Sequence, residues 1–205
     1  MSRKTVHAAV YDSLADWEAG AALANIADTS WHREPGVFEV RTVGLTAEPI
    51  TTMGRFRVTP ELALADLDPA DSAMLILPGA DLWSGEALMP FAETAKRFVE
   101  AGVPVAGICG ATTGLARVGL LDDRAHTSNA SEALALPGYS GAAHYVDAPA
   151  VTDRDVITAN AMSPFEFARE IFARLDLFDP PVLDAWFQLF AHKDASAYAA
   201  LTATE

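Results

Sequence analysis

One short stretch, residues 103–129, constrains the fold more than any other part of the chain. An apolar run at 105–108 leads directly into Cys109, the only cysteine in the sequence. The residues that follow it are all small: Gly110, Ala111, Thr112, Thr113 and Gly114. This pattern predicts a strand, an abrupt turn that carries the cysteine, and then a helix, because a chain that reverses within a few residues leaves no room for larger side chains.

Two roles are open for this thiol. Amide groups at a helix N-terminus favour the thiolate over the thiol and so lower the pKa of a cysteine, which would make Cys109 a nucleophile. Free cysteine is also among the most frequently buried residue types, and Cys109 would then be an inert part of the core. The spacing of the residues does not choose between these two roles.

Composition excludes several classes of protein. The chain has 205 residues, which suits one domain with a single core. Its net charge is -14, with 28 acidic against 14 basic side chains, and this argues against binding to a nucleic-acid backbone. One cysteine rules out an internal disulfide and a cysteine-based metal site, and no histidines or carboxylates have metal-ligand spacing. We therefore expect no metal and no cofactor.

Targeting signals are also missing from the sequence. The apolar run near the N-terminus is too short and too broken for a signal peptide. No stretch approaches the ~20 apolar residues that a membrane helix needs. We expect a cytoplasmic protein that has neither a membrane nor a nucleic acid as its partner.

Apolar runs typical of strands alternate along the chain with amphipathic segments typical of helices. The expected strands are at residues 5–11, 37–43, 51–59, 73–77, 105–108, 125–128, 150–152 and 156–159. The expected helices are at 14–27, 86–101, 111–118 and 164–177, with one or two more in 182–201. Ser13 and Asp16 have the spacing of a capping box for the first helix.

This alternation predicts an α/β fold with a doubly wound, mostly parallel sheet and helices on both faces. We expect residues 1–178 to form this domain, and residues 179–205 to form a helical extension packed on it. Loops 12–18, 78–83 and 109–113 each follow an expected strand. Binding sites of such sheets lie at the carboxyl ends of the strands, so this placement favours a functional role for the cysteine.

Five segments together resemble the DJ-1/PfpI (ThiJ) family of the class I glutamine amidotransferase-like superfamily. They are DSLADWE at 12–18, LILPGA at 75–80, VAGICG at 105–110, GLLDDRAHTSN at 119–129 and DVITANAMSPFEFARE at 155–170. The resemblance spans most of residues 5–177. It implies a flavodoxin-like fold, commonly a homodimer, with a reactive cysteine on the turn. Family members include glyoxalases or deglycases, peptidases, hydratases, chaperones and stress sensors.

The resemblance implies roles for individual residues. Cys109 matches the family nucleophile, and Glu18 matches the acidic residue that contacts it. Gly79, Ala80 and Gly110 match the turns whose backbone N–H groups form an oxyanion-type site. A bare carboxylate beside a thiolate would raise both pKa values, whereas a protonated Glu18 would donate a hydrogen bond to the sulfur and could later move a proton. The alternative for Glu18 is an ordinary exposed carboxylate on a helix.

The chain also departs from the family pattern. Gly110 stands where the peptidase-like branch has histidine, and Asn129 stands where other members place a histidine near the thiol. His126 lies three residues before Asn129, which puts it on the opposite face of an alternating strand. We therefore expect neither a Cys-His-acid triad nor peptidase activity.

Four further residues are candidates for the pocket, each with a plainer alternative. His144 follows a glycine-rich loop and could swing toward the cleft or stay solvated. Trp83 could wall the pocket or pack in the core, and Asp81 could line it or simply belong to a turn. Thr127, with Ser128, could offer hydroxyl groups or merely suit a strand.

The leading hypothesis is a cysteine-dependent enzyme that acts on a small carbonyl or acyl compound, as a hydrolase or a glyoxalase-like lyase. One alternative is a redox-responsive stress protein, in which Cys109 is oxidised to the sulfinate without turnover. Another is a catalytically silent binding module on the same fold. The expected partners are a small-molecule substrate and a second copy of the chain, since the aromatic stripe in 185–198 could pack on the domain or on another subunit.

Overall fold

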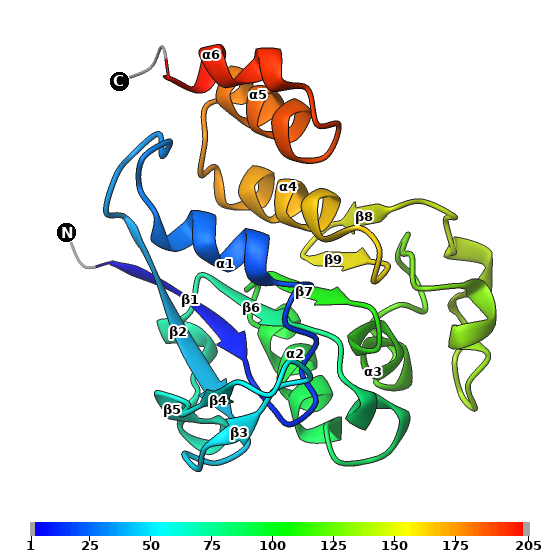
Figure 1. The fold of residues 1–205 in the computed structure, drawn as a ribbon. Coiled ribbons are helices and arrows are strands. Elements are labelled where there is room, and N and C mark those ends of the chain that lie inside the picture. Colours follow the sequence, from blue (N-terminus) through cyan, green and yellow to red (C-terminus); the bar gives the residue numbers. More distant parts are fainter. Residues whose placement is uncertain (1–2, 203–205) are drawn as a thin grey trace.

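The computed structural model describes residues 3–202, and within them a seven-stranded sheet forms the centre of the molecule (Figure 1). Its strand order is β5-β2-β1-β6-β7-β9-β8. The bounds are β1 (Lys4–Ala9), β2 (Phe38–Gly44), β5 (Leu62–Ala63), β6 (Met74–Leu77), β7 (Val105–Ile108), β8 (Ala150–Asp153) and β9 (Val156–Ala159). Neighbouring strands are parallel except for β8 and β9, which are antiparallel. The predicted flavodoxin-like, doubly wound and mostly parallel sheet is therefore confirmed.

Helices cover both faces of this sheet (Figure 1). One face carries α1 (Gly20–Ala27) and α4 (Pro164–Leu175), and the other carries α2 (Met89–Glu100) and α3 (Ala111–Arg117). The chain ends with α5 (Pro180–Phe190) and α6 (Tyr198–Thr202) outside α4. Short 3₁₀ helices connect these elements: η1 (Leu64–Asp66), η2 (Pro69–Asp71), η3 (Asp81–Ser84), η4 (Ser131–Leu134), η5 (Gly141–His144) and η6 (Ala195–Ala197).

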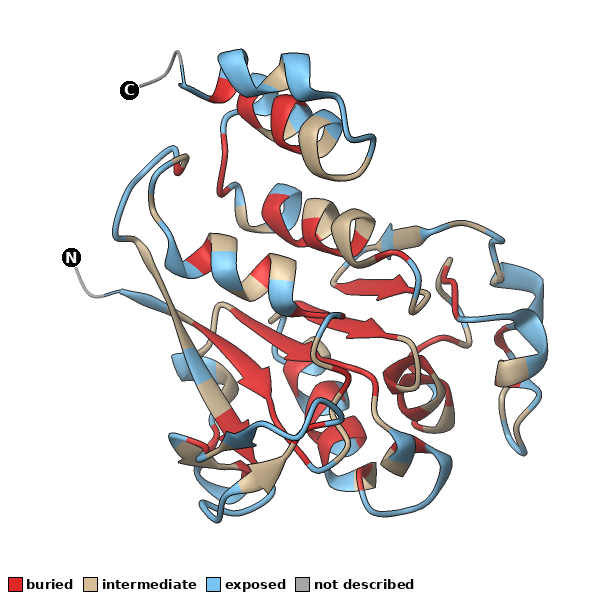
Figure 2. Cartoon of the chain, viewed as in Figure 1, coloured by how far each residue is buried: buried red, intermediate tan, exposed pale blue. Residues whose placement is uncertain are grey.

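The central strands are buried along their whole length, as Figure 2 shows. Leu75 and Leu77 of β6 enter the apolar layer beneath α2 and α3, whereas Met74 and Ile76 enter the layer beneath α1 and α4. Successive side chains of a strand point to opposite faces, so a strand covered on both sides must be apolar at every position. This is why continuous apolar runs, and not alternating ones, mark the centre of the sheet.

The first helix begins at Gly20, six residues later than predicted, and the capping box is wrong. Ser13 Oγ accepts a hydrogen bond from the Asp81 N–H at 3.1 Å, and Asp16 Oδ2 accepts one from the Gly54 N–H at 2.6 Å. Both side chains are therefore committed to distant loops and not to a helix terminus. The segment before Gly20 is a loop fastened to the small hairpin of β3 (Ile50–Thr51) and β4 (Arg57–Val58).

The strand predicted at 125–128 is also absent. Its only ladder contact is an isolated bridge between His126 and Tyr145. The N–H of Thr127 donates to a side chain, Thr158 Oγ1, at 2.9 Å. The nearby strand β9 is already paired with β7 on one side and β8 on the other, so it has no free edge to offer.

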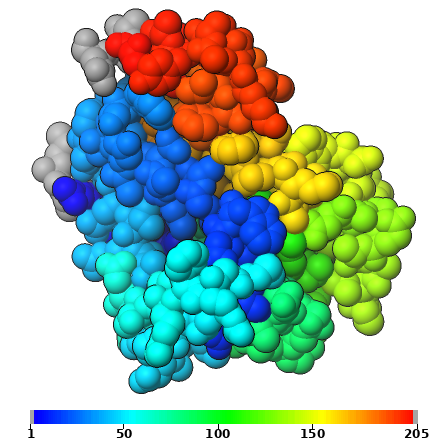
Figure 3. Space-filling model, viewed as in Figure 1, coloured from blue at the N-terminus to red at the C-terminus, as the bar shows by residue number. Residues whose placement is uncertain are grey.

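The C-terminal helices pack on the layer formed by α1 and α4, and the space-filling view in Figure 3 shows their orange and red atoms directly against both. Trp186 of α5 is fully buried, its ring lies 4.9 Å from that of Phe172, and its Nε1 donates to Asn25 Oδ1 at 3.1 Å. Leu201 of α6 is buried in the same layer. The aromatic stripe thus packs largely on the domain. In the part of the chain that the structure describes, no helix is both long enough and apolar enough to span a membrane.

Two helical glycines offer a matched test of this packing. A Cβ on Gly114 would come within 2.2 Å of Trp83 Cζ3, whereas one on Gly20 would meet nothing within 4 Å. Trp83 cannot move aside freely, because its Nε1 donates to the Pro78 carbonyl at 3.0 Å. We expect Gly114→Ala to lower the free energy of unfolding by about 1–3 kcal/mol. Gly20→Ala should raise it by roughly 0.5–1 kcal/mol. Urea unfolding measures both values, and equal effects would contradict the packing described.

Candidate active site at the Cys109 turn

Cys109 lies on a sharp turn between β7 and α3, as the sequence predicts. Its φ is 58°, in the left-handed region that residues other than glycine rarely adopt. Such a conformation costs of order 1–3 kcal/mol and persists only where its surroundings hold it. Here the Cys109 N–H donates to the Ala159 carbonyl at 2.9 Å, and its carbonyl accepts from Thr112 Oγ1 at 2.6 Å. The turn is thus fastened to β9 on one side and to α3 on the other.

Three loops meet at this edge of the sheet, because β1, β6 and β7 are parallel neighbours whose carboxyl ends coincide. The Ala15 N–H donates to the Gly79 carbonyl at 2.9 Å. Glu18 is 1% exposed, and its Oε2 accepts from the Gly79 N–H at 2.5 Å. A Cβ on Gly79 would lie 2.5 Å from Glu18 Oε2 and 2.8 Å from Cys109 Cβ. The carboxyl and the thiol-bearing carbon therefore lie on either side of this glycine.

The expected oxyanion-type site is only partly available in this arrangement. The Gly79 N–H already donates to Glu18 Oε2, so it could serve a substrate oxygen only if that hydrogen bond were broken, and its expected role stays a prediction. The Gly110 N–H faces the Cys109 sulfur and lowers the pKa of the thiol. Ala80 sits at an isolated bridge with Leu14, and its N–H has no hydrogen-bond partner among residues 3–202.

Burial raises the pKa of the Glu18 carboxyl, although its interactions with the Cys109 thiol and the Gly79 N–H lower it in part. Glu18 Oε1 is sealed from solvent and makes no hydrogen bond of normal geometry with any described residue. A buried carboxylate oxygen without a donor is costly, so the environment favours a proton on this group. Glu18 is not the exposed helix carboxylate of the alternative interpretation.

The Cys109 thiol does not have the low pKa expected from a helix N-terminus. Burial raises its pKa to about 11, and the neighbouring Glu18 carboxylate raises it as well. Hydrogen bonds from Asn129 and Gly110 lower the pKa but do not compensate for these effects. Of the amides at the start of α3, that of the N-cap residue Gly110 interacts with the sulfur, whereas the Thr112 N–H donates to the Cys109 carbonyl.

Asn129 contacts the sulfur, a role that the sequence analysis missed. Its Nδ2 donates to Cys109 Sγ at 3.2 Å, and its Oδ1 accepts from the Ala161 N–H at 2.9 Å. The Ala161 carbonyl in turn accepts from Trp17 Nε1 at 3.2 Å. Because the oxygen of the carboxamide is held by Ala161, its N–H must face the thiol. From the sequence, the asparagine found where family members place a histidine indicates only that a base is missing. In the structure, the side-chain amide of Asn129 donates a hydrogen bond to the sulfur instead.

The other predicted pocket residues do not contact the sulfur in the described part of the chain. Trp83 is 3% exposed and packs in the core, and Thr127 Oγ1 donates to the Ala148 carbonyl at 2.8 Å. Asp81 is exposed and lines a neighbouring cavity of about 370 Å³. His144 is exposed, and its backbone carbonyl accepts from the His126 N–H.

His126 is fully buried away from the thiol. Its Nδ1 donates to the Arg124 carbonyl at 2.7 Å, so its Nε2 is left to accept from Tyr139 Oη, also at 2.7 Å. Burial lowers the pKa of the imidazole. Both ring nitrogens are therefore used in the fold. No cluster of three or more potential metal ligands occurs within residues 3–202.

Gly79 provides a direct test of the geometry around Cys109. In Gly79→Ala, the new methyl group would displace the Glu18 carboxyl or the Cys109 turn. We expect a loss of about 1–3 kcal/mol in the free energy of unfolding and a changed rate of Cys109 alkylation. Gly85→Ala is the matched control, because its Cβ would meet only the Leu82 carbonyl oxygen at 3.9 Å. Unchanged stability in Gly79→Ala would contradict the close approach.

Comparison with known proteins gives a consistent result. A sequence model of the DJ-1/PfpI family matches residues 4–174. The Bacillus subtilis protein named uncharacterized protease YoaZ is 33% identical over 192 residues, which cover 92% of this chain and 91% of YoaZ.

Two solved structures are also similar. A ThiJ/PfpI family protein from Bacillus anthracis has a TM-score of 0.93 and 35% identity, covering 98% of this chain and 97% of its own. A DJ-1 superfamily protein from Agrobacterium tumefaciens has a TM-score of 0.82 and 38% identity, covering 93% and 98%. The chain therefore belongs to the DJ-1/PfpI family.

Proposed function

We propose that this protein is a cysteine-dependent enzyme that acts on a small carbonyl or acyl compound, with Cys109 as nucleophile and Glu18 as proton carrier. The observation that carries the proposal is the sealed Glu18 carboxyl held beside the strained Cys109 turn by the Gly79 N–H. Perturbed pKa values and strained backbone at the carboxyl edge of a parallel sheet are typical of catalytic sites.

The raised pKa values of both groups mean that the pair retains at least one proton at neutral pH, and the reactive form is the one with a proton on the thiol and a carboxylate at Glu18. In the proposed step, this proton moves from the thiol to the Glu18 carboxylate as Sγ attacks the carbonyl carbon. The S–C bond forms while the C=O π electrons move to the substrate oxygen. Glu18 then returns the proton to that oxygen, which gives a hemithioacetal bound to Cys109. With a 2-oxoaldehyde, Glu18 would next move the C–H proton of this adduct to the adjacent carbonyl carbon through an enediol, and water would hydrolyse the resulting thioester to a 2-hydroxy acid and the free thiol. The free Ala80 N–H supplies a donor for the developing negative charge.

With an acyl substrate, the tetrahedral adduct would collapse and expel its leaving group, which takes the proton from Glu18. Release of the acyl group then requires an activated water molecule. No histidine contacts the sulfur in the described residues, since Gly110 and Asn129 occupy the positions where relatives carry one. The Bacillus subtilis relative YoaZ is named as an uncharacterized protease, but the donor-only contact from Asn129 supports an aldehyde more than a peptide as substrate.

A redox-responsive protein without turnover is the second candidate. Cys109 is partly exposed, and the N–H groups of Asn129 and Gly110 face its sulfur, where they could bind sulfinate oxygens. A thiol pKa of about 11 opposes this role, because the thiolate is the form that peroxide oxidises. The homodimer and the cytoplasmic location expected from the sequence stay predictions.

The acidity of the Cys109 thiol can be measured through its rate of alkylation. With a pKa of about 11, the thiolate fraction rises tenfold per pH unit through pH 7 to 10, so the rate of alkylation by iodoacetamide should rise with pH and not level off in that range. Glu18→Gln removes a charge that raises the thiol pKa, so alkylation at pH 8 should become faster. Asn129→Ala removes a donor to the sulfur and should make it slower. A plateau near pH 8 in the unmodified protein would show that the raised pKa is wrong.

Turnover can be measured with methylglyoxal as the carbonyl probe and p-nitrophenyl acetate as the acyl probe. Cys109→Ala should abolish consumption of methylglyoxal, and Glu18→Gln should lower kcat by about 10²–10⁴-fold through loss of proton transfer. Glu93→Gln, an exposed carboxylate on α2, is the matched control and should retain activity. No turnover with either probe, together with a two-oxygen mass increase on Cys109 after mild peroxide, would support the redox candidate instead.

A further inference from the structure

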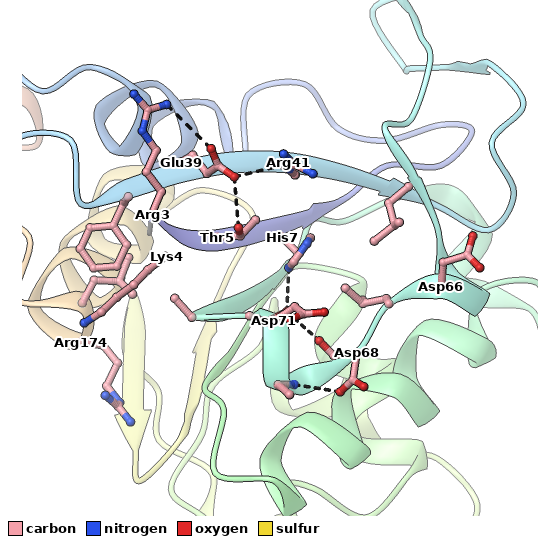
Figure 4. A pocket seen from close by; sticks show the side chains of 17 residues that line it. Arg3, Lys4, Thr5, His7, Glu39, Arg41, Asp66, Asp68, Asp71 and Arg174 are labelled. Carbon is pink, nitrogen blue, oxygen red and sulfur yellow. Dashed lines mark hydrogen bonds and ion pairs between the residues drawn. The ribbon is translucent and has the colours of Figure 1, made fainter. Parts of the chain in front are cut away.

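A cavity of about 850 Å³ lies at the amino ends of the strands, at the opposite edge of the sheet from Cys109 (Figure 4). Its walls come from the starts of β1 and β2, from the η1–η2 segment (residues 64–71), and from the end of α4. Its volume lies within the range of small-molecule sites, roughly 300–1,000 Å³. We call it the amino-edge groove.

The groove is enriched in positive charge relative to the rest of the molecule. Four basic side chains line it, out of 14 in the chain, and four acidic ones, out of 28. The ratio of basic to acidic groups is therefore 4:4 in the groove but 1:2 overall. The excess of acidic side chains that the chain as a whole carries is therefore absent from this groove.

The charges are also separated within the groove. Figure 4 shows Arg3, Lys4 and Arg174 on one side, where Glu39 lies beside Arg3, and Asp66, Asp68 and Asp71 away from them, with His7 and Arg41 above Asp71. Opposite charges that served only to stabilise the fold would be expected to pair across the groove. In the described residues, no ion pair joins the two sides.

On the basic side, Lys4 is the cation left without a carboxylate. Arg174 pairs with Asp155 at 2.5 Å. Arg3 and Arg41 share one carboxylate, Glu39, at 3.8 and 3.2 Å. Among the contacts of residues 3–202, the Lys4 ammonium group has only a cation–π contact, with Nζ 5.8 Å from the centre of the Phe38 ring.

On the acidic side, three carboxylates come from six consecutive residues. Asp68 Oδ1 accepts from the Ala70 N–H at 2.9 Å, which fixes the loop. Asp66 and Asp71 are exposed and form no ion pair with any described residue. A bound ammonium group would be attracted to both of these carboxylates.

His7 joins the two sides. It is only 4% exposed, and its Nδ1 is hydrogen-bonded to Ser72 Oγ at 2.7 Å, while Ser72 Oγ also lies 3.4 Å from the Asp68 carbonyl. Its Nε2 has no hydrogen-bond partner among the described residues and is not sealed from the groove. Burial and the nearby Arg41 lower the pKa of His7, so a neutral imidazole offers this nitrogen to a ligand.

We propose that the amino-edge groove binds a zwitterion of the amino-acid or short-peptide class. Its ammonium group would face Asp66 and Asp71, its carboxylate would face Lys4, and its apolar part would contact Leu67 and Leu175. A simple anion would meet three carboxylates, and a simple cation would meet Lys4 and the arginines. A ligand that carries both charges is complementary to both sides.

The dipeptide Leu-Leu is a suitable probe, titrated into the intact protein by calorimetry and followed by the NMR signal of the His7 imidazole. We expect saturable binding, with N-acetyl-Leu-Leu and Leu-Leu amide at least about tenfold weaker, because each lacks one charge. Lys4→Gln should weaken binding of Leu-Leu about tenfold but leave the amide unaffected. Asp71→Asn should weaken Leu-Leu but leave the N-acetyl compound unaffected.

Two controls isolate the groove. Lys96→Gln and Asp147→Asn alter exposed charges that do not line it, and should leave binding of Leu-Leu unchanged. Cys109→Ala should also bind Leu-Leu normally, so this test is independent of the reaction at the other edge. The absence of saturable binding up to about 10 mM would overturn the proposal. Equal binding of all three peptides would overturn it too.

Discussion

The hydrogen bond from the Gly79 N–H to the buried Glu18 carboxyl is the interaction on which the candidate site depends. It requires the loops after β1 and β6 to meet, and the absence of a side chain at Gly79 lets Cys109 approach from the third loop. All of this follows from parallel neighbours in the order β1-β6-β7, which bring their carboxyl ends to one edge. Any change in strand order would separate the carboxyl from the thiol.

Burial is the main cause of the raised pKa values of Glu18 and Cys109. Both groups are stabilised in their neutral forms, so the pKa of each is raised, and a second negative charge is disfavoured once one is present. A histidine beside the sulfur would accept a proton near neutral pH. Asn129 can only donate through Nδ2, since its oxygen is held by Ala161. Within the described residues, Glu18 is therefore the group placed to take the proton of the thiol.

Much of this could be predicted from sequence, for identifiable physical reasons. Strands buried on both faces must be apolar throughout, so β6 and β7 were evident, and the small residues after Cys109 revealed the turn. The predictions that were wrong or incomplete concern residues whose hydrogen-bond partners lie far away in the sequence. The side chains of Ser13 and Asp16 bind backbone groups some 40 to 70 residues away, which no local pattern records. The donor role of Asn129 likewise depends on Ala161, and the pKa of Cys109 depends on burial.

The two edges of the sheet differ in how their polar groups are satisfied. At the carboxyl edge, Glu18, Asn129 and the Cys109 turn are held by hydrogen bonds from neighbouring loops, so their geometry is fixed before a substrate arrives. At the amino edge, Lys4 and Asp71 lie at the ends of β1 and η2 and have no partner of opposite charge among residues 3–202. A parallel sheet produces this difference readily, because each edge collects a separate set of loops. One edge can therefore be selected for chemistry while the other is selected for binding, without either altering the shared core.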